Sequence, residues 1–332
     1  MATIYDVARQ AGVSIGTVSR FLNQNGYVSE AARERIQAAV EALGFAPSGV
    51  ARGLSSKQTR MIGVVVPDLV NLFIPEVVRG IQDVMDNAGY CAVIYNTDGL
   101  GAREARALKL LYERRVDGMI LLPPSSEEGN AQIEELHRQG LPQVLLGRDL
   151  PGLPLDSVTV DTYRGAVEAM QHLLALGHTR IAFVSDRRLK RLSGRLSGYR
   201  DALEQAGLPL DDELLFEMSS MYKGTVLDRM LQVQDPPTAV FSMNDMIAID
   251  VIQEAYQRGI KVPDHLSIIG FDDITFAASV QPPLTTIAQP KSLLGQTAAE
   301  LLLARIEQKA SLPVQEVLLS CQLIVRMSTA RR

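Results

Sequence analysis

The 332-residue sequence predicts a small all-α head joined by a short linker to a larger α/β body. Apolar side chains recur at helical spacing in residues 3–44, whereas from residue 61 onward short apolar runs alternate with amphipathic stretches. Such alternation of strands and helices is typical of parallel sheets that are covered on both faces. Residues 1–60 carry seven basic and four acidic side chains, although the whole chain has a net charge of −5. A basic head therefore precedes an acidic body.

The head is predicted to contain three short helices, of which the first two form a helix-turn-helix. The first helix starts with a capping box and ends at a glycine, and the second and third each follow a serine. In a helix-turn-helix the second helix enters the major groove of DNA, and its early residues reach the base edges. The alternative is an ordinary three-helix bundle. The predicted caps and helix ends are Thr3 with Asp6, Gly12, Ser14, Ser29 and Gly44.

The second helix, predicted over 15–22, offers side chains suited to reading a DNA sequence. Arg20 can donate two hydrogen bonds to a guanine, a contact worth about 1 to 3 kcal/mol of discrimination. Ile15 can touch a thymine methyl group, whereas Gly16 leaves its base pair weakly read. The hydroxyl groups of Thr17 and Ser19 suit phosphate oxygens. The alternative for Arg20 is a solvated helix surface.

Four short motifs carry a resemblance to a known family. They are Ile-Tyr-Asp-Val-Ala at 4–8, Ala-Gly-Val-Ser at 11–14, Thr-Val-Ser-Arg at 17–20 and Val-Ala-Arg-Gly-Leu at 50–54. Over about 55 residues the chain resembles the N-terminal signature of the lactose/galactose repressor (LacI/GalR) family. The resemblance implies binding to double-stranded DNA, with the operator read at the positions of Ile15, Gly16 and Arg20. The predicted DNA-binding residues are Thr3, Tyr5, Ser14, Ile15, Gly16, Thr17, Ser19, Arg20, Asn23, Val50, Ala51, Arg52 and Leu54.

Residues 47–60 form the predicted hinge and linker. Two glycines in eight residues each cost about 1 kcal/mol relative to alanine, so the segment is a poor helix by itself. The family resemblance implies a hinge helix that forms on DNA and pushes Leu54 between the central base pairs of the minor groove. Gly49 departs from the bulkier residue usual at its position, and the alternative is a plain flexible linker.

The body is predicted to hold two doubly wound subdomains. It resembles a type I periplasmic sugar-binding protein over its whole length. The resemblance implies one lobe at about 61–161 plus 291–320 and a second at about 162–290 plus 321–332. The predicted domains are thus a helix-turn-helix domain at 1–46, a hinge at 47–60, and an effector-binding and dimerisation domain at 61–332. The strand candidates are 61–67, 91–95, 117–122, 143–147, 180–185, 238–242 and 266–271.

A ligand of such sheets lies beyond the carboxyl ends of the strands, here in the cleft between the lobes. Arginine, asparagine and carboxylate side chains at these ends suit the vicinal hydroxyls of a sugar or a ring nitrogen. Arg195 matches the family's ligand-gripping arginine. The predicted effector-binding residues are Phe73, Ile74, Ser125, Arg148, Arg195, Asn244 and Asp272.

Several of these residues have a structural alternative. Arg195 and Asp272 could instead form a salt bridge between the lobes, and Phe73 could belong to the core. Asn244 and Asp245 could cap the helix that follows them.

Other functions find no support in the sequence. No hydrolase, metalloprotease or P-loop motif occurs, and the dinucleotide-binding fingerprint that starts at Gly99 and Gly101 has Glu104 in place of its third glycine. We therefore expect no catalytic residues and no cofactor. Cys91 and Cys321 are expected to be buried thiols. The four histidines have no metal-ligand spacing and are expected at the surface or in loops: His137, His172, His178 and His265.

The sequence contains no run of about 18 apolar residues and no export signal. A cytoplasmic protein without a membrane partner is therefore expected. Because one recognition helix reads too few bases, a homodimer on a palindromic operator is predicted. The hypothesis is a transcriptional repressor controlled by a sugar or sugar derivative. The alternatives are a nucleoside or purine effector, a plain solute-binding protein, and a sugar or nucleotide enzyme. Too few residues follow 317–325 for a tetramerising heptad repeat.

Overall fold

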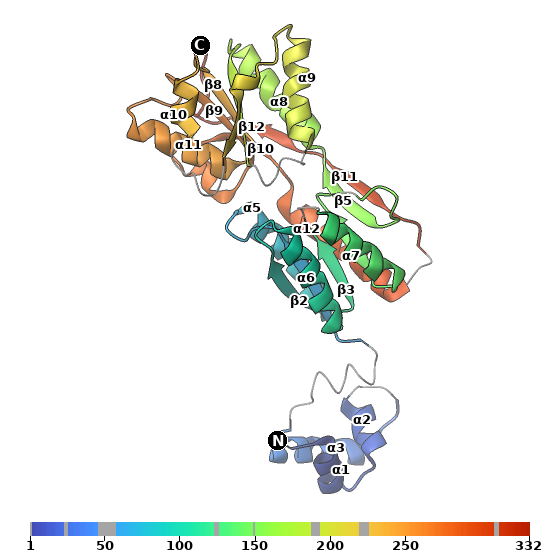
Figure 1. Cartoon of the computed structure of the whole chain (residues 1–332). Coiled ribbons are helices and arrows are strands. Elements are labelled where there is room, and N and C mark those ends of the chain that lie inside the picture. Colours follow the sequence, from blue (N-terminus) through green and yellow to red (C-terminus); the bar gives the residue numbers. More distant parts are fainter. Residues whose placement is uncertain are drawn as a thin grey trace. The chain divides into compact units, whose positions relative to one another are not determined.

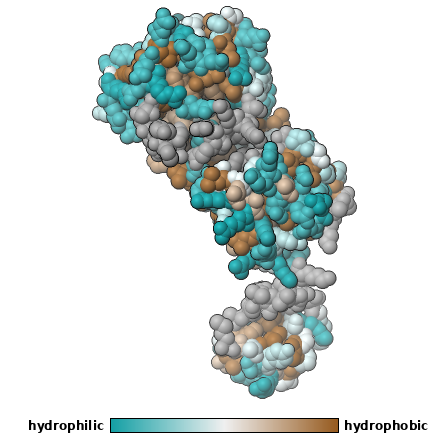
Figure 2. Space-filling view, viewed as in Figure 1, coloured by the Kyte–Doolittle hydropathy of each residue, from teal (hydrophilic) through white to brown (hydrophobic). Residues whose placement is uncertain are grey.

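The computed structural model describes residues 2–22, 26–45, 58–122, 126–148, 150–186, 193–218, 226–308 and 312–332 (Figure 1). The chain divides into two compact units, residues 1–60 and residues 61–332. Among the described residues, no helix is long and apolar enough to cross a membrane. Hydrophilic and hydrophobic residues are mixed on the face of the body shown in Figure 2.

The head consists of helices α1 (Ile4–Ala11), α2 (Ile15–Leu22) and α3 (Glu30–Leu43). The predicted capping box is present, because the backbone N–H of Asp6 donates to the Thr3 hydroxyl and the Asp6 carboxylate accepts from the Thr3 backbone. Ser29 precedes α3 without a side-chain capping bond. The three helices enclose a core of Val7, Ala8, Ala11, Val18, Val28, Ala32, Ile36 and Ala39. The predicted hinge helix lies outside the described residues.

The first sheet of the body is parallel and has the strand order β11-β5-β4-β3-β1-β2. Helices cover both of its faces. Successive side chains of β1 point to opposite faces of the sheet and are apolar on both, so both faces must be covered. Val64 and Val66 lie in the apolar cluster formed with α5 and α12, whereas Val65 lies in the cluster formed with α6 and α7. The elements are β1 (Met61–Val66), α5 (Phe73–Asn87), β2 (Cys91–Asn96), α6 (Gly101–Glu113), β3 (Gly118–Leu121), α7 (Glu127–Arg138), β4 (Gln143–Leu146), β5 (Asp156–Val160), α12 (Lys291–Gln308) and β11 (Glu316–Leu319).

The second sheet has the order β12-β10-β9-β8-β6-β7, in which only β12 runs antiparallel to its neighbour. Helices α8 and α9 lie together on one side of it, and α10 and α11 lie on the other (Figure 1). The elements are α8 (Thr162–Ala175), β6 (Ile181–Asp186), α9 (Ser193–Gln205), η2 (Asp212–Leu214), β7 (Leu215–Met218), α10 (Val226–Leu231), β8 (Ala239–Ser242), α11 (Asp245–Gln257), β9 (Ser267–Asp272), η3 (Thr275–Ala278), β10 (Thr285–Ala288) and β12 (Gln322–Ile324).

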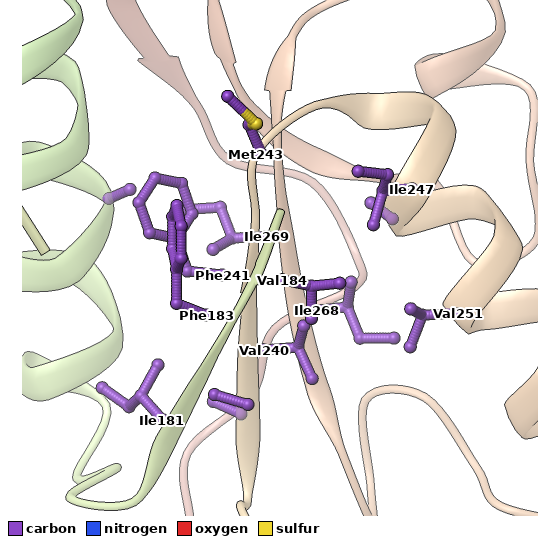
Figure 3. Close-up of a cluster of buried hydrophobic side chains, with 14 of the residues drawn as sticks. Ile181, Phe183, Val184, Val240, Phe241, Met243, Ile247, Val251, Ile268 and Ile269 are labelled. Atoms are coloured by element: carbon purple, nitrogen blue, oxygen red, sulfur yellow. The ribbon is translucent and has the colours of Figure 1, made fainter. Parts of the chain in front are cut away.

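The core of this second lobe shows the same two-faced packing (Figure 3). Phe183 and Phe241 stack edge to face on one side of the sheet, with ring centroids 5.4 Å apart. Val184 and Val240 point to the opposite side, toward α11. Two predominantly parallel sheets with helices on both faces confirm the predicted fold class.

The expectation that both cysteines are buried is wrong for Cys91. This residue is exposed because it lies on β2, the edge strand of the first sheet, whereas Cys321 is partly buried. His178 lies in a loop as expected, between α8 and β6, but it is only 4% exposed. Its Nε2 lies 3.0 Å from both the Ser267 hydroxyl and the Ala330 carbonyl oxygen, so the ring ties the C-terminal segment to β9.

Candidate DNA-binding and effector sites

Helix α2 presents one side to solvent and the other to the core of the head. Val18 is fully buried, whereas Ile15, Gly16 and Arg20 are exposed. The helix starts where predicted, because the Ser14 hydroxyl accepts the backbone N–H of Thr17. The burial of Val18 therefore fixes which residues α2 turns outward.

Some of the other predicted DNA-binding residues lie on the described helices, and the rest lie outside the described residues. Thr3 and Tyr5 are exposed at the start of α1, and Ser19 is partly buried on α2. The Thr17 hydroxyl lies 2.9 Å from the Ser14 hydroxyl, so both belong to the cap of α2. The residues that lie outside the described part of the chain are Asn23, Val50, Ala51, Arg52 and Leu54.

A buried ion pair marks the carboxyl edge of the second sheet. Asp272 ends β9, and α9 carries Arg195, whose Nη2 donates to Asp272 Oδ1 over 3.4 Å. The guanidinium also lies over the ring of Phe271, 4.1 Å from its centroid. The alternative that Arg195 pairs with Asp272 is therefore confirmed. Its placement between the lobes is wrong, because both elements belong to the second lobe. The pair cannot hold the two sheets together, because α9 packs on the sheet that contains β9.

The Arg195–Asp272 pair is buried. Arg195 is 8% exposed and Asp272 is 3% exposed. Burial raises the pKa of Asp272 to about 6, although Arg195, Gln289 and Lys291 oppose this shift. Burial also lowers the pKa of Arg195, and its Nε has no hydrogen-bond partner within the described residues. A guanidinium has five N–H donors, so this one retains capacity for a polar ligand.

Asn244 and Asp245 follow β8 at the same edge. Asn244 caps α11, since its Oδ1 accepts the backbone N–H of Ile247 over 2.9 Å. Asp245 is not a cap, because it is the first residue of α11 itself. The side chain of Asp245 is buried and points toward the sheet. There its carboxylate accepts from the hydroxyl of Thr286 over 2.5 Å and from the backbone N–H of Ile274 over 2.8 Å. Burial and the neighbouring Asp272 raise the pKa of Asp245 to about 8.

The candidate residues of the first lobe are not all brought together. Phe73 begins α5 and packs against the apolar clusters of both lobes. Ile74 is 5% exposed within the core of the first lobe. Arg148 is also buried, and it donates to the Glu104 carboxylate over 2.5 Å and to Asn130 over 2.7 Å. These contacts give Arg148 a structural role inside the first lobe. Ser125 lies outside the described residues.

Glu104 explains the broken glycine fingerprint. Its side chain is 1% exposed, and it accepts from Arg148 and from the hydroxyl of Ser126. Burial raises the pKa of Glu104, while Arg148 opposes that shift. The position that would hold a glycine beside a dinucleotide therefore carries half of a buried ion pair.

Sequence reasoning missed two residues that hold Asp272. The side chain of Gln289 donates to Asp272 Oδ1 over 2.6 Å, and Lys291 Nζ donates to the Asp272 carbonyl oxygen over 3.1 Å. Both follow β10, whose short polar sequence Thr-Thr-Ile-Ala was not among the strand candidates. Recognition of β10 would have placed them at the same carboxyl edge. No cluster of three metal-binding side chains occurs in the part of the chain that the structure describes.

The fold and these sites define a helix-turn-helix head on a periplasmic-binding-protein-like body, and comparisons with known proteins agree. The family model "Bacterial regulatory proteins, lacI family" matches residues 3–48, and "Periplasmic binding protein-like domain" matches residues 170–329. The HTH-type transcriptional regulator DegA of Bacillus subtilis (strain 168) is 38% identical over 340 residues, covering 99% of this chain and 98% of its own. The HTH-type transcriptional repressor PurR of Vibrio parahaemolyticus is 37% identical, covering 93% of each chain.

Solved structures show the same relationship. A lac repressor dimer bound to operator and the anti-inducer ONPF has a TM-score of 0.86 at 30% identity, covering 99% of each chain. The transcriptional regulator CelR in complex with cellobiose has a TM-score of 0.71 at 30% identity, covering 99% of this chain and all of that one. The chain belongs to the lacI family of bacterial regulatory proteins. It is a DNA-binding transcriptional regulator and not an enzyme.

Proposed function

We propose that this regulator is a repressor that binds a palindromic operator as a homodimer and responds to a sugar or sugar derivative. The head comprises residues 1–46, the hinge and linker 47–60, and the two-lobed effector-binding body 61–332. The buried Arg195–Asp272 pair carries the proposal. A cation and an anion held 3.4 Å apart at the carboxyl edge of a sheet can share hydrogen bonds with neighbouring hydroxyl groups.

In the head, Ile15, Gly16 and Arg20 would read the operator from the exposed side of α2. The hydroxyl groups of Thr17 and Ser19 would contact phosphates, and Thr3, Tyr5, Ser14 and Asn23 would complete the DNA contacts of the head. The hinge residues, with Leu54 as a wedge, would bend the DNA in the minor groove.

The exposed edge of the first sheet supports a dimer. Strand β2 lies at the end of the sheet, and Val93 and Ile94 on it are 38% and 37% exposed. Exposed apolar edge strands are usually covered by another element or another chain. A two-fold dimer would present two recognition helices to half-sites about one helical turn apart.

The chemistry at Asp272 favours a polyhydroxylated effector. Arg195 supplies the Nε donor, which has no partner within the described residues, and the Asp272 carboxylate supplies an acceptor beside it. Relatives of this chain with solved structures include a cellobiose complex and a ribose-bound regulator. Phe73, which contacts the apolar clusters of both lobes, favours a second candidate, a nucleoside or purine whose flat ring stacks on it.

Two measurements test the proposal. Footprinting with genomic fragments should protect a palindromic segment, and a sugar should change that protection. A thermal-shift screen with ribose, cellobiose, other sugars, sugar phosphates and nucleosides should identify the effector, because a ligand that binds only the folded state raises the unfolding temperature. Fragments that stay unprotected with every compound, or an Arg195→Met variant that responds like the wild type, would refute it.

A further inference from the structure

Lys291 contacts the loop after β9 and the first lobe at the same time. It begins α12, where the chain passes from the second sheet to the first. Its Nζ donates to the carbonyl oxygens of Asp272 and Asp273. The same nitrogen lies 3.5 Å from Oε2 of Glu76 on α5. An ammonium has three N–H donors, which matches the three oxygens of Asp272, Asp273 and Glu76 around Nζ. The Lys291 side chain is only 10% exposed.

The loop that Lys291 holds has an unfavourable backbone conformation. Asp272 has φ 113° and Asp273 has φ 53°. Residues with a side chain rarely adopt positive φ, and such conformations persist only where the surroundings enforce them. The two unusual residues direct successive carbonyl oxygens to one ammonium. Lys291 thus stabilises the turn that sets the position of Asp272.

The segment around Lys291 also orients the Asp272 carboxylate. Gln289, two residues earlier, donates to Asp272 Oδ1 over 2.6 Å, the same oxygen that accepts from Arg195. Side chain and backbone of Asp272 are therefore held by residues 289 and 291 together. Residues 289–291 continue directly into α12. A displacement of Asp272 would therefore also displace the first residues of that helix.

Glu76 connects the loop to the first lobe in a second way. The hydroxyl of Thr275, the first residue of η3, donates to Glu76 Oε1 over 3.1 Å. Glu76 lies in the first turn of α5, three residues after Phe73, which packs against the apolar clusters of both lobes. One carboxylate of the first lobe therefore receives both Lys291 and Thr275.

We propose that Lys291 is a positioning residue that holds the Asp272 loop in its strained turn and couples it through Glu76 to helix α5 of the first lobe. This inference rests on the proposed function, since it assigns the coupling to the effector site. A ligand that moves Asp272 moves the ammonium and Glu76 with it. The occupied site thereby acts on the lobe that directly follows the hinge in the chain.

Hydrogen–deuterium exchange of the full chain tests the coupling without a ligand. In Lys291→Met, peptides from 272–280 and from the start of α5 should exchange at least roughly tenfold faster, a change that corresponds to about 1.4 kcal/mol. Lys291→Arg should restore part of the protection. Glu76→Gln keeps an oxygen for Thr275 but loses the charge opposite Lys291, so it should accelerate exchange in 272–280 by a smaller factor. Lys109→Met, at an exposed position of α6, should change neither segment.

Two results would overturn the inference. The first is a Lys291→Met variant in which residues 272–280 exchange at the wild-type rate. The other is faster loop exchange in Lys291→Met with no change at α5 and none in Glu76→Gln, because that pattern describes a purely local role. Glu76 is 37% exposed at its side chain, so Glu76→Gln remains informative if Lys291→Met fails to fold. A wild-type protein that protects no DNA refutes the proposed function instead, and the exchange data still decide the coupling.

Discussion

Replacing Asp272 with asparagine removes a buried charge but keeps an oxygen at the position that accepts hydrogen bonds. Both Arg195 and Gln289 donate to Oδ1, which the amide oxygen of asparagine can replace. Asparagine also tolerates the positive φ of this position. The variant therefore imitates the protonated form of Asp272 in its native geometry.

The expected gain in stability follows from the pKa of Asp272. Raising it from 3.8 to about 6 corresponds to about 3 kcal/mol. A raised carboxyl pKa means that the folded state binds the proton more tightly than the unfolded state does. This contribution is fully present below pH 3.8 and is lost as the pH rises through about 6. At pH 7 the wild type carries the whole cost of the buried charge, so Asp272→Asn should be more stable by up to about 3 kcal/mol.

Denaturant titrations followed by far-UV circular dichroism suit this protein, which has no tryptophan. The advantage of Asp272→Asn should shrink to about half at pH 5, and the variant should lose its response to the effector found in the thermal-shift screen. Asp273→Asn is the matched control, because Asp273 forms a partly exposed ion pair with Arg326 and its loss should cost no more than about 1 kcal/mol. Equal or lower stability of Asp272→Asn at pH 7 would refute the reasoning.

Three further predictions concern the head, the dimer and the C-terminal segment. Arg20→Ala should relax preference at one base pair of a randomised operator by about 1 to 3 kcal/mol, and a uniform loss over all sequences would contradict direct readout. Ile94→Glu should shift sedimentation toward monomer, whereas Leu318→Glu, on the exposed strand at the opposite edge of the same sheet, should not. Burial lowers the pKa of His178, so its contribution to stability is present above pH 6.5 and lost as the pH falls through the folded-state value. His178→Gln should flatten the acid side of a plot of unfolding temperature against pH, and an unchanged slope would contradict this assignment.

Local patterns were enough to predict much of the fold. The capping box of α1 joins residues three positions apart, and Gly12 ends that helix with φ 64°, so both features depend on neighbours in the chain. The seven strand candidates of the body correspond to observed strands because continuous apolar runs are typical of buried parallel strands. The strands outside that set, such as β5, β7 and β10, are short and carry polar residues.

The helical head, the alternation of strands and helices, and the family motifs could be predicted from the sequence, because they depend on backbone geometry and on residues within a few positions of one another. Tertiary structure alone decided the roles of the buried charges. Glu104 meets Arg148 44 positions away, and Glu76 meets Thr275 199 positions away. Whether a buried charge is paired, and with which partner, depends on where distant segments pack, and removal from water makes that choice energetically decisive.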